Sequence, residues 1–213
     1  MILDIPHIFK HAQVRLRRLP VAEKIDVASY IATSAALIGG LNTMQPEILK
    51  AAQLWIDSLR CGGKILFCGN GGSAADAEHL TAELMGRFLI ERDPMPALAL
   101  TVNSSAATAI ANDYGFNHVF ARQLRAVARA GDVLVGLSTS GNSRNVIDAF
   151  IAARAMGVAT IALTGAGGGQ LAPLTDVLLA VADHRTNHIQ EAHIVLGHLI
   201  CAIVEQQLCS SRP

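Results

Sequence analysis

The stretch Asp132-Val133-Leu134-Val135-Gly136-Leu137-Ser138-Thr139-Ser140-Gly141-Asn142-Ser143 decides the fold of this chain. Its first half is a short apolar run typical of a strand buried in a sheet, and residues 145–156 carry helical spacing. Four hydroxyl groups therefore stand where a strand passes into a helix, at the positive end of the helix dipole. This arrangement favours a phosphate-binding loop. The alternative is a serine or threonine N-cap, which requires one hydroxyl group and not four.

The same alternation of apolar runs and helical spacing extends over most of the chain. Strands are predicted at residues 64–68, 97–100, 133–137, 159–163 and 177–181. Helices are predicted near residues 22–38, 46–60, 74–89, 106–111, 119–130, 145–156 and 187–207, with a short turn near 170–174. This order predicts an α/β fold with a doubly wound, five-stranded parallel sheet flanked by helices, preceded by N-terminal helices. Ligands of such sheets bind beyond the carboxyl ends of the strands.

The composition excludes several classes of function. Lys plus Arg and Asp plus Glu both number 17, so the net charge is zero, which argues against nucleic acid or an acidic membrane as partner. No apolar stretch approaches the roughly 20 uncharged residues of a membrane span, and the first residues lack a signal-peptide pattern. The four cysteines have no metal-ligand spacing, so we expect reduced thiols in a cytoplasmic protein. An apolar content of 51% predicts a homo-oligomer.

A glycine-rich loop, Gly69-Asn70-Gly71-Gly72-Ser73, follows the first predicted strand. Glycines let the backbone approach a ligand, and Ser73 is expected to cap the next helix while offering a hydroxyl group. The loop is neither a phosphate loop with Gly-Lys-Ser/Thr nor a full dinucleotide fingerprint. It is therefore interpreted as a site for a small polar ligand, with a plain tight turn as the alternative.

Two other loops end predicted strands or the helices beside them. Asn112-Asp113-Tyr114-Gly115 offers an amide and a carboxylate that fix sugar hydroxyls in one interpretation and form a simple Asx turn in the other. Thr164-Gly165-Ala166-Gly167-Gly168-Gly169 is predicted to be a mobile rim that carries little chemistry.

Histidine and glutamate side chains recur on two predicted helices. His79 and Glu83 are four residues apart and therefore share one helix face. Three interpretations fit this pair: two ligands of a divalent metal, a base beside an imidazole, or a solvated pair on the surface. The final helix adds Gln190, His193 and His198. The alternative for the two histidines is a structural role in the core, with their ring nitrogens hydrogen-bonded. Gln190 and His198 lie about 12 Å apart along a continuous helix. Both side chains can therefore bind one metal only if they approach it from opposite sides, or if different subunits supply them.

Four segments, taken together and in order, resemble the sugar isomerase (SIS) family and, within it, the phosphoheptose isomerases. They are Cys68-Gly69-Asn70-Gly71-Gly72-Ser73, Asn112-Asp113-Tyr114-Gly115, Ser138-Thr139-Ser140-Gly141-Asn142-Ser143, and Ile189-Gln190-Glu191-Ala192-His193 with His198. The resemblance covers about residues 20–208, which we take as one SIS domain. Residues 1–19 look like an N-terminal extension, with disorder as one alternative, and 209–213 look like a tail.

The resemblance implies a function. The family members interconvert sedoheptulose 7-phosphate and D-glycero-D-manno-heptose 7-phosphate, an aldose–ketose isomerisation through an enediol that supplies lipopolysaccharide or surface heptose precursors. It also implies one Zn²⁺ per subunit, a small phosphosugar substrate, and a homotetramer with active sites at subunit contacts. The alternatives are a non-catalytic SIS protein that binds the replication initiator and an isomerase of another phosphosugar.

The resemblance also assigns roles to single residues. Glu83 and His198 match the acid/base pair. The predicted zinc ligands are His79, Glu83, Gln190 and His198. The predicted substrate contacts are Asn70, Gly71, Gly72, Ser73, Glu83, Asn112, Asp113, Ser138, Thr139, Ser140, Ser143 and Gln190, with Asp76 and Arg87 as weaker candidates. Asn187 and His188 depart from the family pattern of Asp-Arg at these positions, which leaves open a contact to the far end of the sugar or a subunit contact.

Overall fold

The structure is a computed structural model that describes residues 25–209. The predicted N-terminal extension, residues 1–19, and residues 210–213 of the predicted tail lie outside the described residues.

One parallel sheet organises the chain, as predicted. Its strands are β1 (Ile65–Gly69), β2 (Ala97–Ala99), β3 (Val133–Ser138), β4 (Ala159–Thr164) and β5 (Val177–Ala180). They lie in the order β2-β1-β3-β4-β5, and every neighbouring pair is parallel. The order reverses direction between β1 and β3, where Gly69 lies opposite Leu137. In a doubly wound sheet this reversal is the switch point at which ligands bind.

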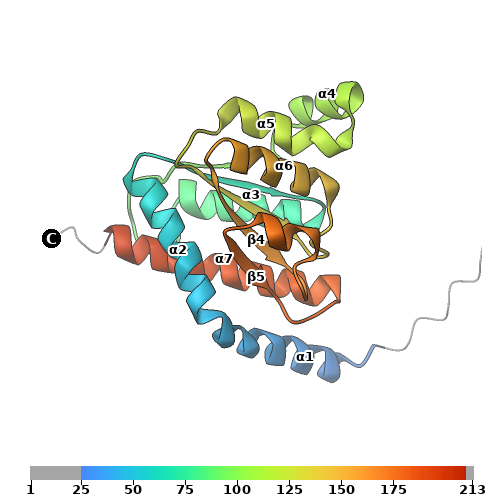
Figure 1. The fold of residues 1–213 in the computed structure, drawn as a ribbon. Helices are drawn as coiled ribbons and strands as arrows, with labels where there is room; N and C mark the ends of the chain where they lie inside the picture. Colours follow the sequence, from blue (N-terminus) through green and yellow to red (C-terminus); the bar gives the residue numbers. More distant parts are fainter. Residues whose placement is uncertain (1–24, 210–213) are drawn as a thin grey trace, which may run out of the picture.

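Helices cover both faces of the sheet (Figure 1). The first face carries α2 (Gln45–Arg60), α3 (Gly72–Met85) and α7 (Thr186–Cys209). The second carries α5 (Val119–Val127) and α6 (Arg144–Ala155), with α4 (Ser104–Tyr114) at its outer edge. The remaining elements are α1 (Val27–Gly40) and the 3-10 turns η1 (Leu41–Met44), η2 (Phe116–His118) and η3 (Gly169–Leu174).

Alternate strand residues supply two separate cores. Ile65 and Phe67 of β1 belong to the core under α2, α3 and α7, whereas Leu66 and Cys68 belong to the core under α5 and α6. This alternation follows from the two-residue period of a strand and explains why the strands read as continuous apolar runs. All four cysteines are free thiols.

The final helix, α7, is the longest element. By length and apolar composition it satisfies the test for a membrane-crossing helix, although the sequence predicts no stretch of that kind. Its buried residues, such as Ile189, Leu196 and Val204, belong to the core under the sheet, and it packs against α1, α2 and α3. We therefore interpret α7 as the core helix of this domain.

Helix α3 is shorter than predicted. It ends at Met85 and not near residue 89, with Gly86 as its C-cap. The chain then turns back, and the guanidinium of Arg92 donates hydrogen bonds to the Glu83, Leu84 and Gly86 carbonyl oxygens at this helix end. A charged group from a later segment thus ends the helix, which local helical spacing does not reveal.

Close packing between β3 and α6 generates a first prediction. A Cβ atom on Gly136 would lie 2.3 Å from Cε2 of Phe150, which is fully buried. We expect Gly136→Ala to lower the free energy of unfolding by about 1–3 kcal/mol, because the ring must move within a filled core.

The matched control is Gly39→Ala in α1, where no described heavy atom lies within 4 Å of the added Cβ. This change is expected to be neutral or to stabilise by up to about 1 kcal/mol, because alanine favours the helix. Urea unfolding of both variants provides the measurement, and equal midpoints for Gly136→Ala and the unchanged protein would contradict the close packing.

Candidate active site

The switch point brings the two loops singled out in the sequence together. Asn70, after β1, and Asn145, in the first turn of α6, exchange side-chain hydrogen bonds in both directions, at 2.9 and 2.8 Å. Asn145 is buried, and its Oδ1 also accepts the N–H of Val146. Sequence reasoning did not select Asn145, because an asparagine in a first helical turn has no distinguishing spacing.

The serine-rich loop adopts the strand-to-helix position that its sequence predicts. Ser143 is the N-cap residue of α6, but within the described structure its side chain makes no capping hydrogen bond. Its hydroxyl oxygen accepts instead from the Ser138 hydroxyl at 2.9 Å. Ser140 accepts the Asn142 N–H at 3.1 Å, which closes the turn. The Ser138 and Ser143 hydroxyls therefore meet at the N-terminus of α6, a position suited to an anion.

The glycine-rich segment after β4 packs against this loop and supports it. Gly141 has a φ of +64°, and a Cβ there would lie 2.1 Å from the Gly168 carbonyl oxygen. The Leu171 N–H donates to the Gly141 carbonyl, and the Gln170 N–H donates to Oδ1 of Asn142. Glycine is needed here for close backbone approach, a supporting role that the sequence did not reveal, and the mobility of this segment stays a prediction.

The loop after β1 differs from prediction at its cap. Gly71, with a φ of +58°, is the N-cap residue of α3, so Ser73 lies inside the helix and is buried. Gly72 is required for a different reason, since a Cβ there would lie 2.6 Å from Nε2 of Gln190. Gln190 of α7 thus packs against the start of α3, beside the loop that sequence analysis assigns to the substrate.

Three predicted metal ligands converge between α3 and α7. Nε2 of His79 lies 2.8 Å from Nε2 of His198 and 3.1 Å from Oε1 of Glu83. The ligand atoms of all three lie within 4.8 Å of one another. Gly197 permits this approach, because a Cβ there would lie 2.5 Å from Cδ2 of Leu80 on α3. The pair of imidazoles and one carboxylate is a donor set typical of catalytic zinc sites.

One side of this group is open and one is covered. The His79 side chain is 48% exposed, whereas that of Glu83 is 20% exposed. The Phe88 ring stacks on the His198 imidazole, with centroids 5.3 Å apart and planes inclined by 24°. A small molecule can reach the group from the His79 side, while Phe88 limits the orientations of His198.

The weaker candidates have other surroundings. Asp76 lies one turn before His79 on α3, and its Oδ2 is buried without a hydrogen-bond partner among residues 25–209. Burial raises the pKa of the Asp76 carboxyl, and the nearby His79 opposes that shift. Arg87 is exposed and pairs with Glu91 at 3.4 Å.

Asn112 and Asp113 lie in the last turn of α4, and both are exposed. Nδ2 of Asn112 donates to Oδ1 of Asp113 at 2.8 Å, and Gly115 ends the helix with a φ of +91°. They are therefore helical and do not form the Asx turn considered above. Within one chain, the described contacts do not join them to the serine-rich loop or to the His79 group, and a substrate role stays a prediction.

His193 is a core residue, the alternative kept open by the sequence. It is completely buried, and its Nε2 donates to the Thr164 carbonyl oxygen at 3.1 Å. Its Nδ1 has no hydrogen-bond partner in the described part of the chain. Desolvation lowers the pKa of His193 to about 4, so the ring is neutral near pH 7.

Asn187 and His188, together with Glu191, anchor α7 to α1. Glu191 accepts hydrogen bonds from the Ser34 hydroxyl at 2.6 Å and from the Tyr30 hydroxyl at 2.7 Å, and both lower its pKa. Nδ1 of His188 lies 2.8 Å from Oγ of Ser34, and Asn187 donates to the Tyr30 oxygen. Asn187 and His188 thus make contacts within the chain, an alternative that the sequence did not reveal.

The fold and these loops define the class of protein. A family model described as the SIS domain matches residues 29–165, and the chain belongs to that family. Within it, the chain belongs to the phosphoheptose isomerase family. It is 54% identical over 185 residues to the phosphoheptose isomerase of Rhodospirillum rubrum, covering 87% of this chain and 98% of the relative. Its identity to the Neisseria meningitidis protein of the same name is 53% over 187 residues, covering 85% and 94%.

Solved structures agree with this membership. A phosphoheptose isomerase from Neisseria gonorrhoeae has a TM-score of 0.80 and 48% identity, covering 84% of this chain and 97% of that one. One from Francisella tularensis has a TM-score of 0.82 and 37% identity, covering 84% and 96%.

The buried imidazole generates a second prediction. Because the unfolded state binds a proton near pH 6.5 and the folded state only near 4, stability falls as the pH drops through this window. From pH 8 to pH 5 we expect His193 to account for a loss of about 2 kcal/mol. Urea unfolding of the unchanged protein and of His193→Gln, whose amide can still donate to Thr164, measures the difference. Equal losses in the two proteins would refute the account of His193.

Proposed function

We propose that this chain is an aldose–ketose isomerase that interconverts sedoheptulose 7-phosphate and D-glycero-D-manno-heptose 7-phosphate in the cytoplasm. The observation that carries the proposal is the convergence of His79 and Glu83, on the helix that begins at the switch point, with His198 of α7. Membership of the phosphoheptose isomerase family supports the choice of substrate over another phosphosugar.

The serine-rich loop is proposed to hold the phosphate. Ser138, Thr139, Ser140 and Ser143 offer hydroxyl donors, and the N-terminus of α6 adds its dipole. Fixing the phosphate positions the other end of the sugar. His79 lies seven residues after Gly72, which is a rise of about 10 Å along α3 from the loop beside the proposed phosphate site. The further substrate contacts that we propose between these two ends are Asn70, Gly71, Gly72, Ser73 and Gln190. Asn112 and Asp113 are proposed to contact the substrate from α4, away from the line between the two ends.

His79, Glu83 and His198 are suited to hold a divalent metal, which we propose to be Zn²⁺, with Gln190 as a fourth ligand. Only one proton fits between the two Nε2 atoms at 2.8 Å, and Glu83 faces the same His79 nitrogen, so a cation satisfies all three groups at once. Bound Zn²⁺ would supply Lewis acidity at the carbonyl and hydroxyl oxygens of the sugar.

Glu83 and His198 are proposed to move the protons. Isomerisation transfers a proton between C1 and C2, which requires a base at carbon and an acid or base at the oxygens. We assign the carbon proton to the Glu83 carboxylate and the oxygen protons to the His198 imidazole. The Phe88 ring against His198 limits the orientations of the imidazole during this transfer.

The proposed assembly is a homotetramer with active sites at subunit contacts. Helix α1 has no buried residue within the described chain although its composition is strongly apolar. Ile25, Val27 and Ile31 are each more than half exposed, and an apolar groove between α2 and α7 includes the half-exposed Leu49 and Leu199. Covering these surfaces by other copies accounts for the apolar content and brings further groups to the sites.

Metal dependence is the third prediction. Purified protein is expected to turn over sedoheptulose 7-phosphate, to lose activity after treatment with a chelator, and to recover when Zn²⁺ is added. Absence of turnover with any divalent metal would overturn the proposal, leaving another phosphosugar or binding of the replication initiator to be tested in its place.

The role of Glu83 is the fourth prediction. We expect Glu83→Gln to lower kcat about 10²–10⁴-fold, because the amide cannot accept the carbon proton. Glu78→Gln is the matched control, since Glu78 is an exposed carboxylate on the same helix. The assignment of the base is wrong if Glu83→Gln turns over sugar at the rate of the control.

A further inference from the structure

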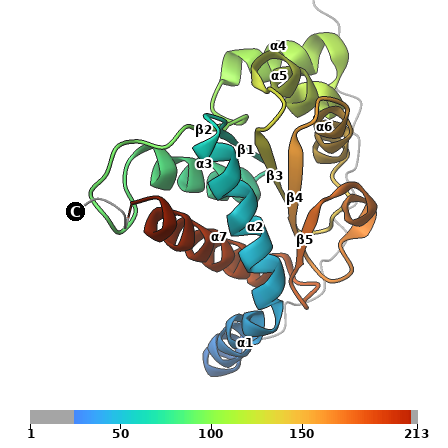
Figure 2. The same ribbon diagram turned by 60° about the vertical axis from the view of Figure 1, so that its left-hand side comes forward.

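A buried ion pair lies at the far end of the two helices that carry the proposed metal ligands. Nε of Arg92 donates to Oε1 of Glu205 at 2.9 Å, and the two side chains are only 4% and 2% exposed. Neither residue belongs to the motifs of the sequence analysis. Figure 2 shows the connection after α3 running beside the C-terminal end of α7, which carries Glu205.

Glu205 holds the backbone of this connection. Its carboxylate accepts the N–H groups of Phe88, Leu89 and Ile90 at 3.1, 2.7 and 2.9 Å. Burial alone would raise the pKa of Glu205, but these donors and Arg92 hold it below its usual value. The carboxylate is therefore ionised and fully used by its partners.

Arg92 holds the end of α3. Its Nη2 donates to the Glu83 carbonyl oxygen at 2.8 Å, and its Nη1 lies within 3.1 Å of the carbonyl oxygens of Leu84, Gly86 and Asp93. The contact with Glu83 is made at the backbone of the proposed base itself. A planar guanidinium fixes these acceptors in one geometry, which a lysine cannot reproduce.

The two sets of contacts meet at the proposed metal ligands. Arg92 fixes the last turn of α3, which carries Glu83, and Glu205 fixes the backbone of Phe88, whose ring stacks on His198. We propose that Arg92 and Glu205 are positioning residues that fix α3 against α7 and thereby set the geometry of His79, Glu83 and His198. The inference rests on the proposed metal site.

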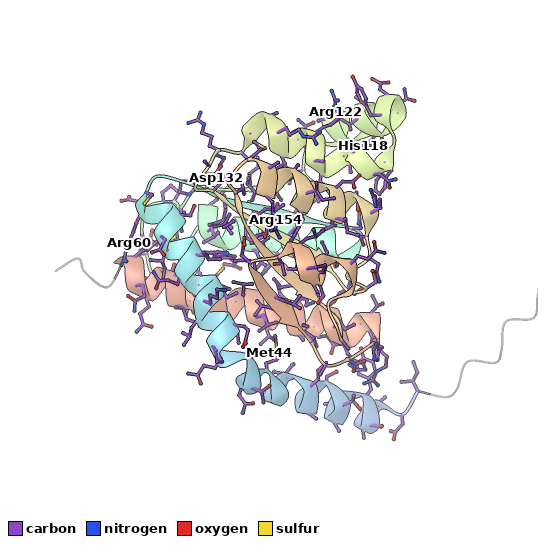
Figure 3. The ribbon with its side chains drawn as sticks, in the orientation of Figure 1. Met44, Arg60, His118, Arg122, Asp132 and Arg154 are labelled. Carbon is purple, nitrogen blue, oxygen red and sulfur yellow. The ribbon has the colours of Figure 1, made fainter. Side chains whose placement is uncertain are left out.

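The attraction between the two charges does not by itself explain an ion pair at this place. Removing two charges from water is so unfavourable that a buried ion pair often adds no net stability over apolar residues of similar size. The chain offers a comparator in Asp132, which is buried, pairs with Lys64 at 2.7 Å and accepts the Arg129 N–H at 2.7 Å. Asp132, labelled in Figure 3, immediately precedes β3, where the strand begins. Among residues 25–209, none of the proposed ligands contacts the Asp132 carboxylate.

The test is zinc affinity, measured by competition with a chromogenic chelator, together with kcat and KM at saturating zinc. The variants are Arg92→Lys, Glu205→Gln and the double variant Arg92→Met/Glu205→Met, with Asp132→Asn as control. We expect the first three to weaken zinc binding by about 10- to 100-fold, as loss of an outer support does, and to lower kcat more than they change KM. Asp132→Asn should lose stability but keep both zinc affinity and kcat per folded subunit.

Zinc affinity per folded subunit, compared with that of Asp132→Asn, separates positioning from folding. In the double variant the N–H groups of residues 88–90 and the carbonyl oxygens at the end of α3 lose their partners, so we expect it to lose stability as well as zinc affinity. Native zinc affinity and kcat in a folded double variant would overturn the inference alone. If the unchanged protein binds no zinc, the proposed metal site and this inference fall together, although turnover of the sugar is then judged separately.

Discussion

The pairing of β1 with β3 is the constraint on which the rest of the structure depends. These strands are neighbours in the sheet but not in the sequence, and Gly69 lies opposite Leu137. Both strands therefore end at the same place, and the loops after them begin α3 and α6. The reciprocal amide contact between Asn70 and Asn145 then joins the loops directly. The proposed phosphate loop and the start of the helix with the candidate ligands are thus adjacent because two strands are parallel.

The packing of α7 on α3 supplies the second half of the site. Gly197 lets the helices approach at Leu80, immediately beside His198. Different types of residue join the two helices at the two ends of this contact. Near the switch point, Gln190 packs on Gly72, and at the opposite end Arg92 and Glu205 join the end of α3 to α7. The helices are therefore fixed on both sides of His79, Glu83 and His198, which is how a rigid scaffold holds a catalytic group in place.

Sequence reasoning predicted the strands, the helices and the serine-rich loop because each has a local signal: apolar runs, helical spacing, or hydroxyls after a strand. It also selected His79, Glu83 and His198, but could not show that they converge, since α3 and α7 are more than a hundred residues apart. It assigned the N-cap of α3 to Ser73, but the N-cap residue is Gly71, which has a positive φ. It missed Asn145, Phe88, Arg92 and Glu205, because their roles depend on partners that are distant in sequence or on burial. The role of His193 stayed open for the same reason. A buried core histidine and a histidine of the site occupy the same kind of position in an apolar helix, so spacing does not distinguish them.

The central claim is that one ligand spans the serine-rich loop and the His79–Glu83–His198 group. Diffraction at the zinc absorption edge, from crystals grown with Zn²⁺ and sedoheptulose 7-phosphate, tests it most directly. The account predicts one anomalous peak per subunit at the three side chains, with the phosphate on the hydroxyls of Ser138, Thr139, Ser140 and Ser143. A metal bound elsewhere, or a phosphate away from this loop, would contradict it.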